Sequence, residues 1–304
     1  MKITNKEFEE LKTSLPEVKD HDFSISDLDC NVDEIINFIW KNPEFQNPKS
    51  SVYLFFKDLL IMKYAAIYKV NNEVDSIFDI KINFPFISLG NINSRHFFGI
   101  DELLIYKFYQ NNVDRYKKIC DIGTNIGLHS KILCELNYSV DSYEPDIVHS
   151  KIAQNYLEGC SNNTFHQKAV SSYDGNAQFT KIINNTTGSY INDKKESYGP
   201  TEVYEVEVVN ASKLAGKFDL FKLDVEGSEV DILKSFQKED FDISDIIAEI
   251  STEPTRQEFW NLFSSLKIPV YAQKISWEKV ESIEDLPTSH REGSIFISKN
   301  NTWC

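Results

Sequence analysis

Two glycines and a carboxylate lie close together in residues 120–128, which read Cys-Asp-Ile-Gly-Thr-Asn-Ile-Gly-Leu. The residues before Asp121 are apolar and predict a short strand, and those after Gly127 predict a helix. Gly123 permits a tight turn. The missing side chain at Gly127 lets the helix begin close to the sheet and brings its free N–H groups toward a ligand. This pattern predicts a cradle for a nucleoside-bearing cofactor.

The acidic residue at the end of this strand restricts which cofactor fits. Nicotinamide-binding loops carry a third glycine that clears space for the pyrophosphate, whereas this loop has the spacing Gly-x-x-x-Gly after Asp121. A carboxylate there would repel phosphates, but it can orient backbone groups and face the cationic sulfonium or ammonium group of S-adenosylmethionine. We therefore expect S-adenosylmethionine at Asp121, Gly123, Asn125 and Gly127. A nucleotide-cofactor oxidoreductase is the alternative enzyme class.

A second carboxylate, Glu144, follows the next predicted strand, residues 139–143, and precedes Pro145. Along the sequence, Glu144 follows the glycine loop at close to the offset of about 20 residues at which a carboxylate contacts ribose hydroxyls in Rossmann-type sites. We expect Glu144 to accept two hydroxyl hydrogen bonds, with Pro145 beside it. The alternative is an ordinary tight turn at the glycines and a surface turn at Glu144.

Further acidic residues follow two later predicted strands. Asp224 follows residues 218–223, and open α/β sheets place their chemistry at the carboxyl ends of strands. Glu249, near the end of residues 245–250, would lie beside Asp224 if these strands are neighbours. Two carboxylates there could share a proton, hold a divalent cation or orient a substrate hydroxyl. Alternatively, Glu249 binds a backbone amide in a loop.

We expect Asp224 to act as the base that removes the proton from an acceptor hydroxyl, with Glu249 and His290 as further candidates. His290 lies beside Arg291 in the loop before the last predicted strand, where it is either a substrate contact or an exposed histidine. Lys222 is expected to pair with a neighbouring carboxylate. His129, His149 and His166 are interpreted as structural or surface positions.

Four motifs together resemble the FkbM-type methyltransferases. They are Asp121-Ile-Gly-Thr-Asn-Ile-Gly, Glu144-Pro145, Asn185-x-x-Gly188-Ser189 and Lys222-Leu-Asp-Val-Glu-Gly-Ser-Glu229, and the resemblance covers roughly residues 99–299. It implies a class I methyltransferase fold, S-adenosylmethionine as cofactor, and usually O-methylation of a hydroxyl on a sugar or a polyketide-like product. A methyltransferase fold retained as a non-catalytic binding subunit is the other alternative.

The order of the predicted elements supports an α/β fold. Residues 2–74 have a helical pattern, with helices expected at 33–40 and 52–68, and residues 75–95 have β character, with partial alternation over 77–84. A helix is expected over residues 99–111. From Lys118 onward strands and helices alternate, with one strand expected over residues 164–170, and this order favours a doubly wound, mostly parallel sheet with helices on both faces. We therefore expect a helical extension at 1–74 and a methyltransferase domain at 75–304, with a β lead-in at 75–98.

Composition limits the partners and the compartment. The net charge of -15, from 47 acidic and 32 basic residues, argues against a nucleic-acid partner because the basic residues are not gathered. The apolar run 53–70 contains Lys57, Asp58, Lys63 and Lys69, so no membrane span is expected. The first residues lack the apolar core of a secretory signal, which predicts a cytoplasmic protein.

The 5 cysteines include no C-x-x-C pair and therefore fit neither a disulfide framework nor a zinc site. A small-molecule or glycan acceptor is expected. Its pocket comes from polar loops such as 184–200, so the sequence specifies neither the acceptor nor the oligomeric state.

Overall fold

The computed structural model describes residues 32–191, 199–250 and 252–303. The predicted helical pattern before Val32, Cys30 and Cys304 therefore lie outside the described residues. The described part begins with α4 (Val32–Lys41), a 3-10 turn (Pro43–Gln46) and α5 (Ser51–Asn71), which confirms the two predicted helices. The hydroxyl of Ser50 accepts a hydrogen bond from the Tyr53 N–H and caps α5 at its first turn.

An eight-stranded sheet forms the centre of the molecule, in the order β15-β14-β16-β13-β12-β5-β6-β7. The strands β7, β6, β5, β12 and β13 run parallel, and β16 is antiparallel to both of its neighbours. The bounds are β5 Lys118–Ile122, β6 Ser139–Tyr143, β7 Asn163–His166, β12 Leu220–Leu223, β13 Asp245–Ala248, β14 Val270–Ala272, β15 Glu278–Lys279 and β16 Ile295–Ile297. The doubly wound, mostly parallel fold class is confirmed.

Alternate side chains of the central strands enter two hydrophobic clusters on opposite faces of the sheet. Ile119 and Leu220 belong to one cluster, together with apolar residues of α6 (Ile100–Asn111) and α7 (Leu128–Glu135). Cys120 and Phe221 belong to the other, with those of α9 (Glu229–Lys234) and α10 (Glu253–Leu266). The covering of both faces explains why these strands read as continuous apolar runs.

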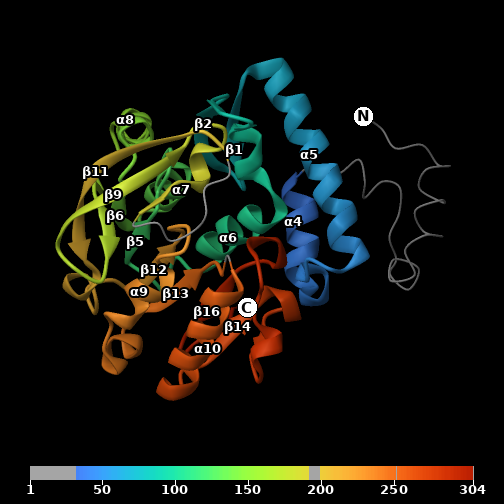
Figure 1. The fold of residues 1–304 in the computed structure, drawn as a ribbon. Helices are drawn as coiled ribbons and strands as arrows, with labels where there is room; N and C mark the ends of the chain where they lie inside the picture. Colours follow the sequence, from blue (N-terminus) through green and yellow to red (C-terminus); the bar gives the residue numbers. More distant parts are fainter. Residues whose placement is uncertain (1–31, 192–198, 251, 304) are drawn as a thin grey trace.

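The N-terminal helices share the first cluster with the last described residues of the chain. Ile36 of α4 and Tyr53 of α5 are buried in it, as is Trp303, which stacks on Trp277 with ring centroids 3.8 Å apart. Figure 1 shows α4 and α5 side by side, on the opposite side of the molecule from β9 and β11. The described part of the extension therefore packs into the same core as the sheet. The division at residue 74 stays a prediction.

Residues 73–85 form a hairpin, which agrees with the β character expected over residues 75–95. β1 (Glu73–Ile77) pairs with β2 (Ile80–Pro85), and the turn between them consists of Phe78 and Asp79, both with positive φ. Phe is uncommon at positive φ, so the partial alternation over residues 77–84 does not reveal the reversal at Phe78 and Asp79. A short second pair follows, β3 (Ser88–Leu89) with β4 (Ile92–Asn93).

The strand expected over residues 164–170 is also divided in two. Its first half is β7, at the edge of the large sheet, and its second half is β8 (Ala169–Ser171). β8 joins a four-stranded sheet with β9 (Gly175–Ile182), β10 (Tyr190–Ile191) and β11 (Thr201–Asn210). The chain changes sheets here because β8 pairs in parallel with β11, some forty residues later along the chain.

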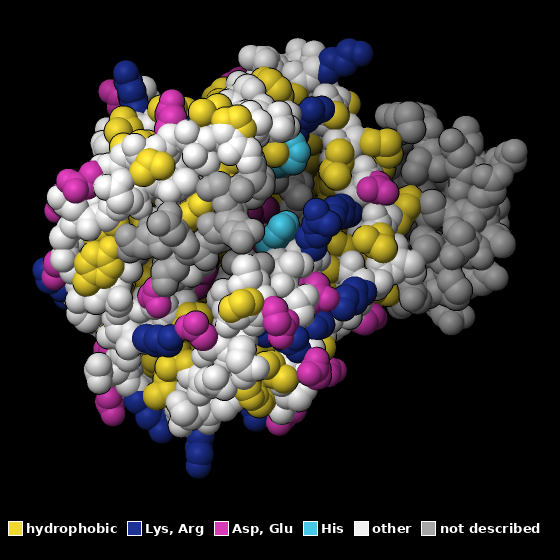
Figure 2. Space-filling model, viewed as in Figure 1, with side chains coloured by type: hydrophobic (Ala, Val, Ile, Leu, Met, Phe, Trp, Pro, Cys, Tyr) yellow, Lys and Arg dark blue, Asp and Glu magenta, His cyan; other side chains and the backbone are white. Residues whose placement is uncertain are grey.

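None of the described helices is both long and apolar enough to cross a membrane. On the face drawn in Figure 2, basic and acidic side chains are interspersed. Cys120 and Cys134 are buried free thiols and Cys160 is a half-buried one.

Candidate active site

A cavity of about 680 Å³ lies at the carboxyl ends of β5, β6, β12 and β13. Figure 2 shows a hollow on this face with histidine side chains beside it. The described lining residues include six carboxylic acids against one lysine and one arginine, Lys168 and Arg291. The acids are Glu102, Glu144, Asp224, Glu226, Glu229 and Glu249. Such a lining favours a ligand that carries positive charge.

The glycine loop after β5 forms one wall, and Gly123 sets its closest approach to β12. Gly123 has a φ of +82°, and a Cβ built on it would lie 1.8 Å from the carbonyl oxygen of Asp224. Only glycine fits this place, so the loop lies directly against the end of β12.

Gly127, the second glycine of the loop, lies against α8 (Ile147–Tyr156), and its predicted part in cofactor binding stays a prediction. Its φ is +96°, and a Cβ there would lie 3.3 Å from Ala153 in α8. The residue thus allows the start of α7 to approach α8 closely. It does not line the cavity.

Asp121 lies behind the loop and does not line the cavity either. Its side chain is fully buried and accepts hydrogen bonds from the hydroxyls of Thr124 and Ser130, the latter at 2.6 Å. Its other oxygen, Oδ1, has no partner among the described residues. In this structure the carboxylate therefore orients the loop, and its predicted contact with a cationic group stays a prediction.

Glu144, Pro145 and Asn125 line the cavity where β5 and β6 end. The Glu144 carboxylate accepts the N–H of Asn125 at 2.9 Å and the N–H of Asp146 at 2.8 Å. Burial raises the pKa of Glu144 to about 8. The Oδ1 atom of Asn125 is buried and lacks a partner among the described residues, so it can accept a hydrogen bond from a ligand.

Asp224 opens the second wall, at the end of β12. The Lys222 ammonium lies 3.0 Å from Asp224 Oδ2, which confirms that Lys222 pairs with a neighbouring carboxylate. Although burial lowers it, the charges of Asp224 and Asp121 raise the pKa of Lys222 above its ordinary value. Lys222 is therefore a charged group beneath the cavity floor.

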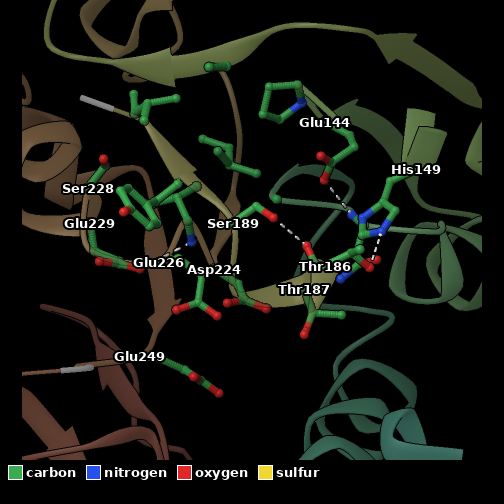
Figure 3. Close-up of a pocket in the computed structure, with 18 of the residues that line it drawn as sticks. Glu144, His149, Thr186, Thr187, Ser189, Asp224, Glu226, Ser228, Glu229 and Glu249 are labelled. Carbon is green, nitrogen blue, oxygen red and sulfur yellow. Dashed lines mark hydrogen bonds between the residues drawn. The ribbon is translucent and has the colours of Figure 1, made fainter. Parts of the chain in front are cut away.

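Glu249 lies beside Asp224 because β12 and β13 are parallel neighbours, with Leu223 opposite Ala248. Figure 3 shows both side chains at the same side of the cavity. Burial, and after it the charge of Asp224, raises the pKa of Glu249 well above its ordinary value. Burial thus favours the protonated form of Glu249, which can donate a hydrogen bond. Among the described residues, no group of three or more metal-ligating side chains is placed to hold an ion.

Glu229 is the first residue of α9 and bonds the turn before it. Its carboxylate accepts the N–H of Val225 at 3.1 Å and the N–H of Gly227 at 3.0 Å. Burial raises the pKa of Glu229 to about 7. Next to it, the buried Ser228 hydroxyl lines the cavity and lacks a partner among the described residues.

Histidines also line the cavity. His290 is exposed at the cavity rim, in the 3-10 turn His290–Glu292. His149, expected at a surface or structural position, is buried and lines the cavity. Its Nε2 lies 2.9 Å from the Thr186 hydroxyl, and burial lowers its pKa to about 4. The sequence feature that indicates a site position for His149 is its place three residues after Asp146, which caps α8 and follows closely after Glu144.

A loop of the small sheet completes the cavity between the two walls. Asn185, Thr186, Thr187 and Ser189 line it, whereas Gly188 does not. Figure 3 shows Thr186, Thr187 and Ser189 between Glu144 on one side and Asp224 on the other.

No curated protein matches this chain. Its structure is similar to the SAH-bound methyltransferase PaMTH1 of Podospora anserina, with a TM-score of 0.38, 10% identity, and 66% of this chain and 79% of the other covered. It is also similar to the StiE O-MT, with a TM-score of 0.36, 12% identity, and coverage of 69% and 78%. For the ribosomal protein L11 methylase of Lactobacillus delbrueckii subsp. bulgaricus the TM-score is 0.35, at 11% identity and coverage of 65% and 76%.

A family model described as the methyltransferase FkbM domain matches residues 98–283. The matched segment contains the glycine loop, Glu144, Asp224 and Glu249, and it ends before His290.

Proposed function

Because this chain belongs to the FkbM methyltransferase family, we propose that it transfers a methyl group from S-adenosylmethionine to a hydroxyl of a sugar or a small natural product. The family and the methyltransferase fold are established, and S-adenosylmethionine is the cofactor of the family. The choice of an oxygen acceptor and the roles of individual residues are the proposal. The observation that carries it is the pair of carboxyl groups, Asp224 and Glu249, at neighbouring strand ends.

The described cavity fits the cofactor. Its excess of carboxylic acids suits a molecule with a sulfonium and an ammonium group, and the unpartnered Asn125 Oδ1 can accept a hydrogen bond from it. Glu144 would accept the ribose hydroxyls, with Pro145 and the Gly123 turn around the nucleoside. The bound cofactor supplies a methyl group activated by its positive sulfur.

The chain's own part in the reaction is to orient the acceptor and to take its proton. Asp224 accepts the hydroxyl proton, and a general base of this kind typically contributes about 10²–10⁴ in rate. Lys222, 3.0 Å away, fixes the position of the Asp224 carboxylate. The protonated form of Glu249, which burial favours, can donate a hydrogen bond to the acceptor. Thr186, Thr187, Ser189 and Ser228 give the cavity hydroxyl groups that suit a hydroxylated acceptor.

The other functions considered for the sequence lead to different expectations. The methyltransferase family match disfavours a nucleotide-cofactor oxidoreductase. A non-catalytic binding subunit would bind the cofactor without methyl transfer. A cytoplasmic location and the lack of a nucleic-acid partner stay predictions from the sequence.

The test is methyl transfer from radiolabelled S-adenosylmethionine to a panel of saccharides and hydroxylated small molecules. Each panel member is matched with a derivative in which the hydroxyls are already methylated. The proposal predicts label in a hydroxylated acceptor, absent from its methylated counterpart, and an O–CH₃ signal in the product. Transfer to nitrogen or carbon would contradict the oxygen acceptor. Cofactor binding without transfer to any acceptor would favour the non-catalytic alternative.

A further inference from the structure

A buried hydrogen-bond chain connects α6 and α7 and ends at the cavity. Glu102 on α6 lines the cavity, and one oxygen of its carboxylate lies 2.8 Å from Nε2 of His129. The other ring nitrogen of His129 lies 3.1 Å from the Tyr109 hydroxyl. The His129 side chain is 6% exposed and that of Glu102 is 25% exposed, so the histidine is enclosed and the carboxylate reaches the opening.

This chain fixes the position of Glu102 relative to the glycine loop. His129 is the second residue of α7, directly after that loop, and the ring of Tyr106 packs against its imidazole with centroids 4.8 Å apart. The Tyr109 hydroxyl and the Glu102 carboxylate lie at the two ring nitrogens, so Nε2 of His129 can donate a hydrogen bond to Glu102. His129 therefore holds the carboxylate in one orientation, and its second oxygen remains available to a ligand.

We propose that Glu102, held by His129, binds the α-amino group of the cofactor's methionyl portion. The inference rests on the proposed function, in which Glu144 holds the ribose at the ends of β5 and β6. The rest of the cofactor then extends toward the edge where Gly123 meets Asp224. Glu102 lies at this part of the cavity, because it is close enough to Lys222 and Glu249 for its charge to act on both.

The charges around Glu102 support a cationic ligand there. The Lys222 ammonium bonds Asp224 and is influenced by Asp121 and Glu102 as well, so one cation faces three carboxylates. An ammonium group from the ligand would reduce this excess of negative charge.

The experiment compares two ligands by calorimetry on the full chain. One is S-adenosylhomocysteine, and the other is the same molecule with hydrogen in place of the α-amino group. Loss of a hydrogen bond to a charged group should weaken binding of S-adenosylhomocysteine to Glu102→Gln about 10- to 100-fold. The deaminated ligand should bind the wild type and Glu102→Gln equally. His129→Asn should show a smaller loss with the same selectivity. The control Glu135→Gln, an α7 glutamate that pairs with Lys131 outside the cavity, should bind both ligands like the wild type.

Other results would contradict either the role of Glu102 or the cofactor site itself. Equal losses of the two ligands in Glu102→Gln would show that Glu102 shapes the cavity without contacting the amino group. Unchanged binding of S-adenosylhomocysteine in a folded Glu102→Gln would overturn the inference alone. A wild type that binds neither ligand would overturn the proposed cofactor site and this inference together.

Discussion

The two walls of the cavity are built in different ways. The wall at β5 and β6 comes from one continuous stretch of chain, and its carboxylates bond its own loop: Asp121 accepts from Thr124 and Ser130, and Glu144 accepts from two backbone N–H groups. The wall at β12 and β13 brings Asp224 and Glu249 together only through sheet order. The first wall is preorganised locally, which suits an invariable cofactor. The second is assembled from distant segments, which suits an acceptor that differs among enzymes of one fold.

The largest expected effect comes from forcing the two walls apart at their contact. In Gly123→Ala the new Cβ would lie 1.8 Å from the Asp224 carbonyl oxygen, so the backbone would have to move. We expect a loss of about 3–5 kcal/mol in the free energy of unfolding, measured by urea denaturation, and loss of S-adenosylhomocysteine binding.

The control for this variant is Gly159→Ala. Gly159 has a similar φ of +89°, but a Cβ there would meet nothing within 4 Å. It should cost only the backbone strain, about 1 kcal/mol, and leave binding intact. Equal losses in the two variants would show that the contact between the walls is unimportant.

The second-largest effect is expected from Asp224→Asn, which distinguishes acceptor chemistry at one wall from cofactor binding at the other. Asp224→Asn keeps the size of the side chain and removes its charge, so we expect turnover to fall by about 10²-fold or more while cofactor affinity stays nearly unchanged. Asp174→Asn, an exposed position bonded to Lys213, is the matched control and should keep full turnover. Parallel loss of affinity and turnover would place Asp224 on the cofactor side. Full turnover would direct attention to Glu249 and His290.

A pH effect tests the first wall. The pKa of Glu144 is about 8 in the free protein, and ribose hydroxyls donate to its ionised form. Below pH 8 the proton must leave before binding, so the affinity for S-adenosylhomocysteine should rise with pH, by up to about tenfold per pH unit, until about pH 8. Calorimetry between pH 5.5 and 9 measures this slope. Glu144→Gln should remove it, and an unchanged slope in that variant would exclude Glu144 as its source.

The raised pKa of Glu144 also has a consequence for stability. The folded state binds this proton more tightly than the unfolded chain does, so the contribution is fully present below the ordinary pKa of 4.5 and is lost as the pH rises through about 8. The free energy of unfolding of the wild type should therefore fall over this range more than that of Glu144→Gln.

The smallest effect concerns the loop between the walls. Thr186→Val removes the hydroxyl that lies 2.9 Å from the buried Nε2 of His149, and we expect it to cost about 1 kcal/mol in urea denaturation. The matched control is Thr187→Val. The Thr187 hydroxyl donates to the half-buried Asn185 side chain, so we expect a smaller loss in the free energy of unfolding. Equal stabilities would show that the His149 contact does not hold the loop.

The difference between the two walls of the cavity also explains which features can be predicted from the sequence. The predicted positions of β5, β6, β12 and β13 are close to the observed bounds, because each is a short strand-forming segment with an acidic residue at or directly after its end. The fold class followed from their alternation with helices. The neighbouring positions of Asp224 and Glu249 were expected only on condition that their strands pair, and the sheet meets that condition.

Features that depend on distant parts of the chain were not predictable. The division of residues 164–170 depends on pairing of β8 with β11, which no local pattern specifies. The helix over residues 99–111 is predicted from its apolar residues. These residues give no indication of a role for Glu102 in the same helix. The sequence predicts only a structural or surface position for His129. Its contacts with Glu102 and Tyr109 form because α6 packs on α7, and this packing cannot be predicted from the local sequence.

A crystal structure with S-adenosylhomocysteine tests the division of labour between the two walls most directly. The account predicts the adenosine beside Pro145, with the ribose hydroxyls bonded to Glu144, and the sulfur facing the cavity toward Asp224. An adenosine bound at the wall of Asp224 and Glu249, or a ribose without contact to Glu144, would contradict it.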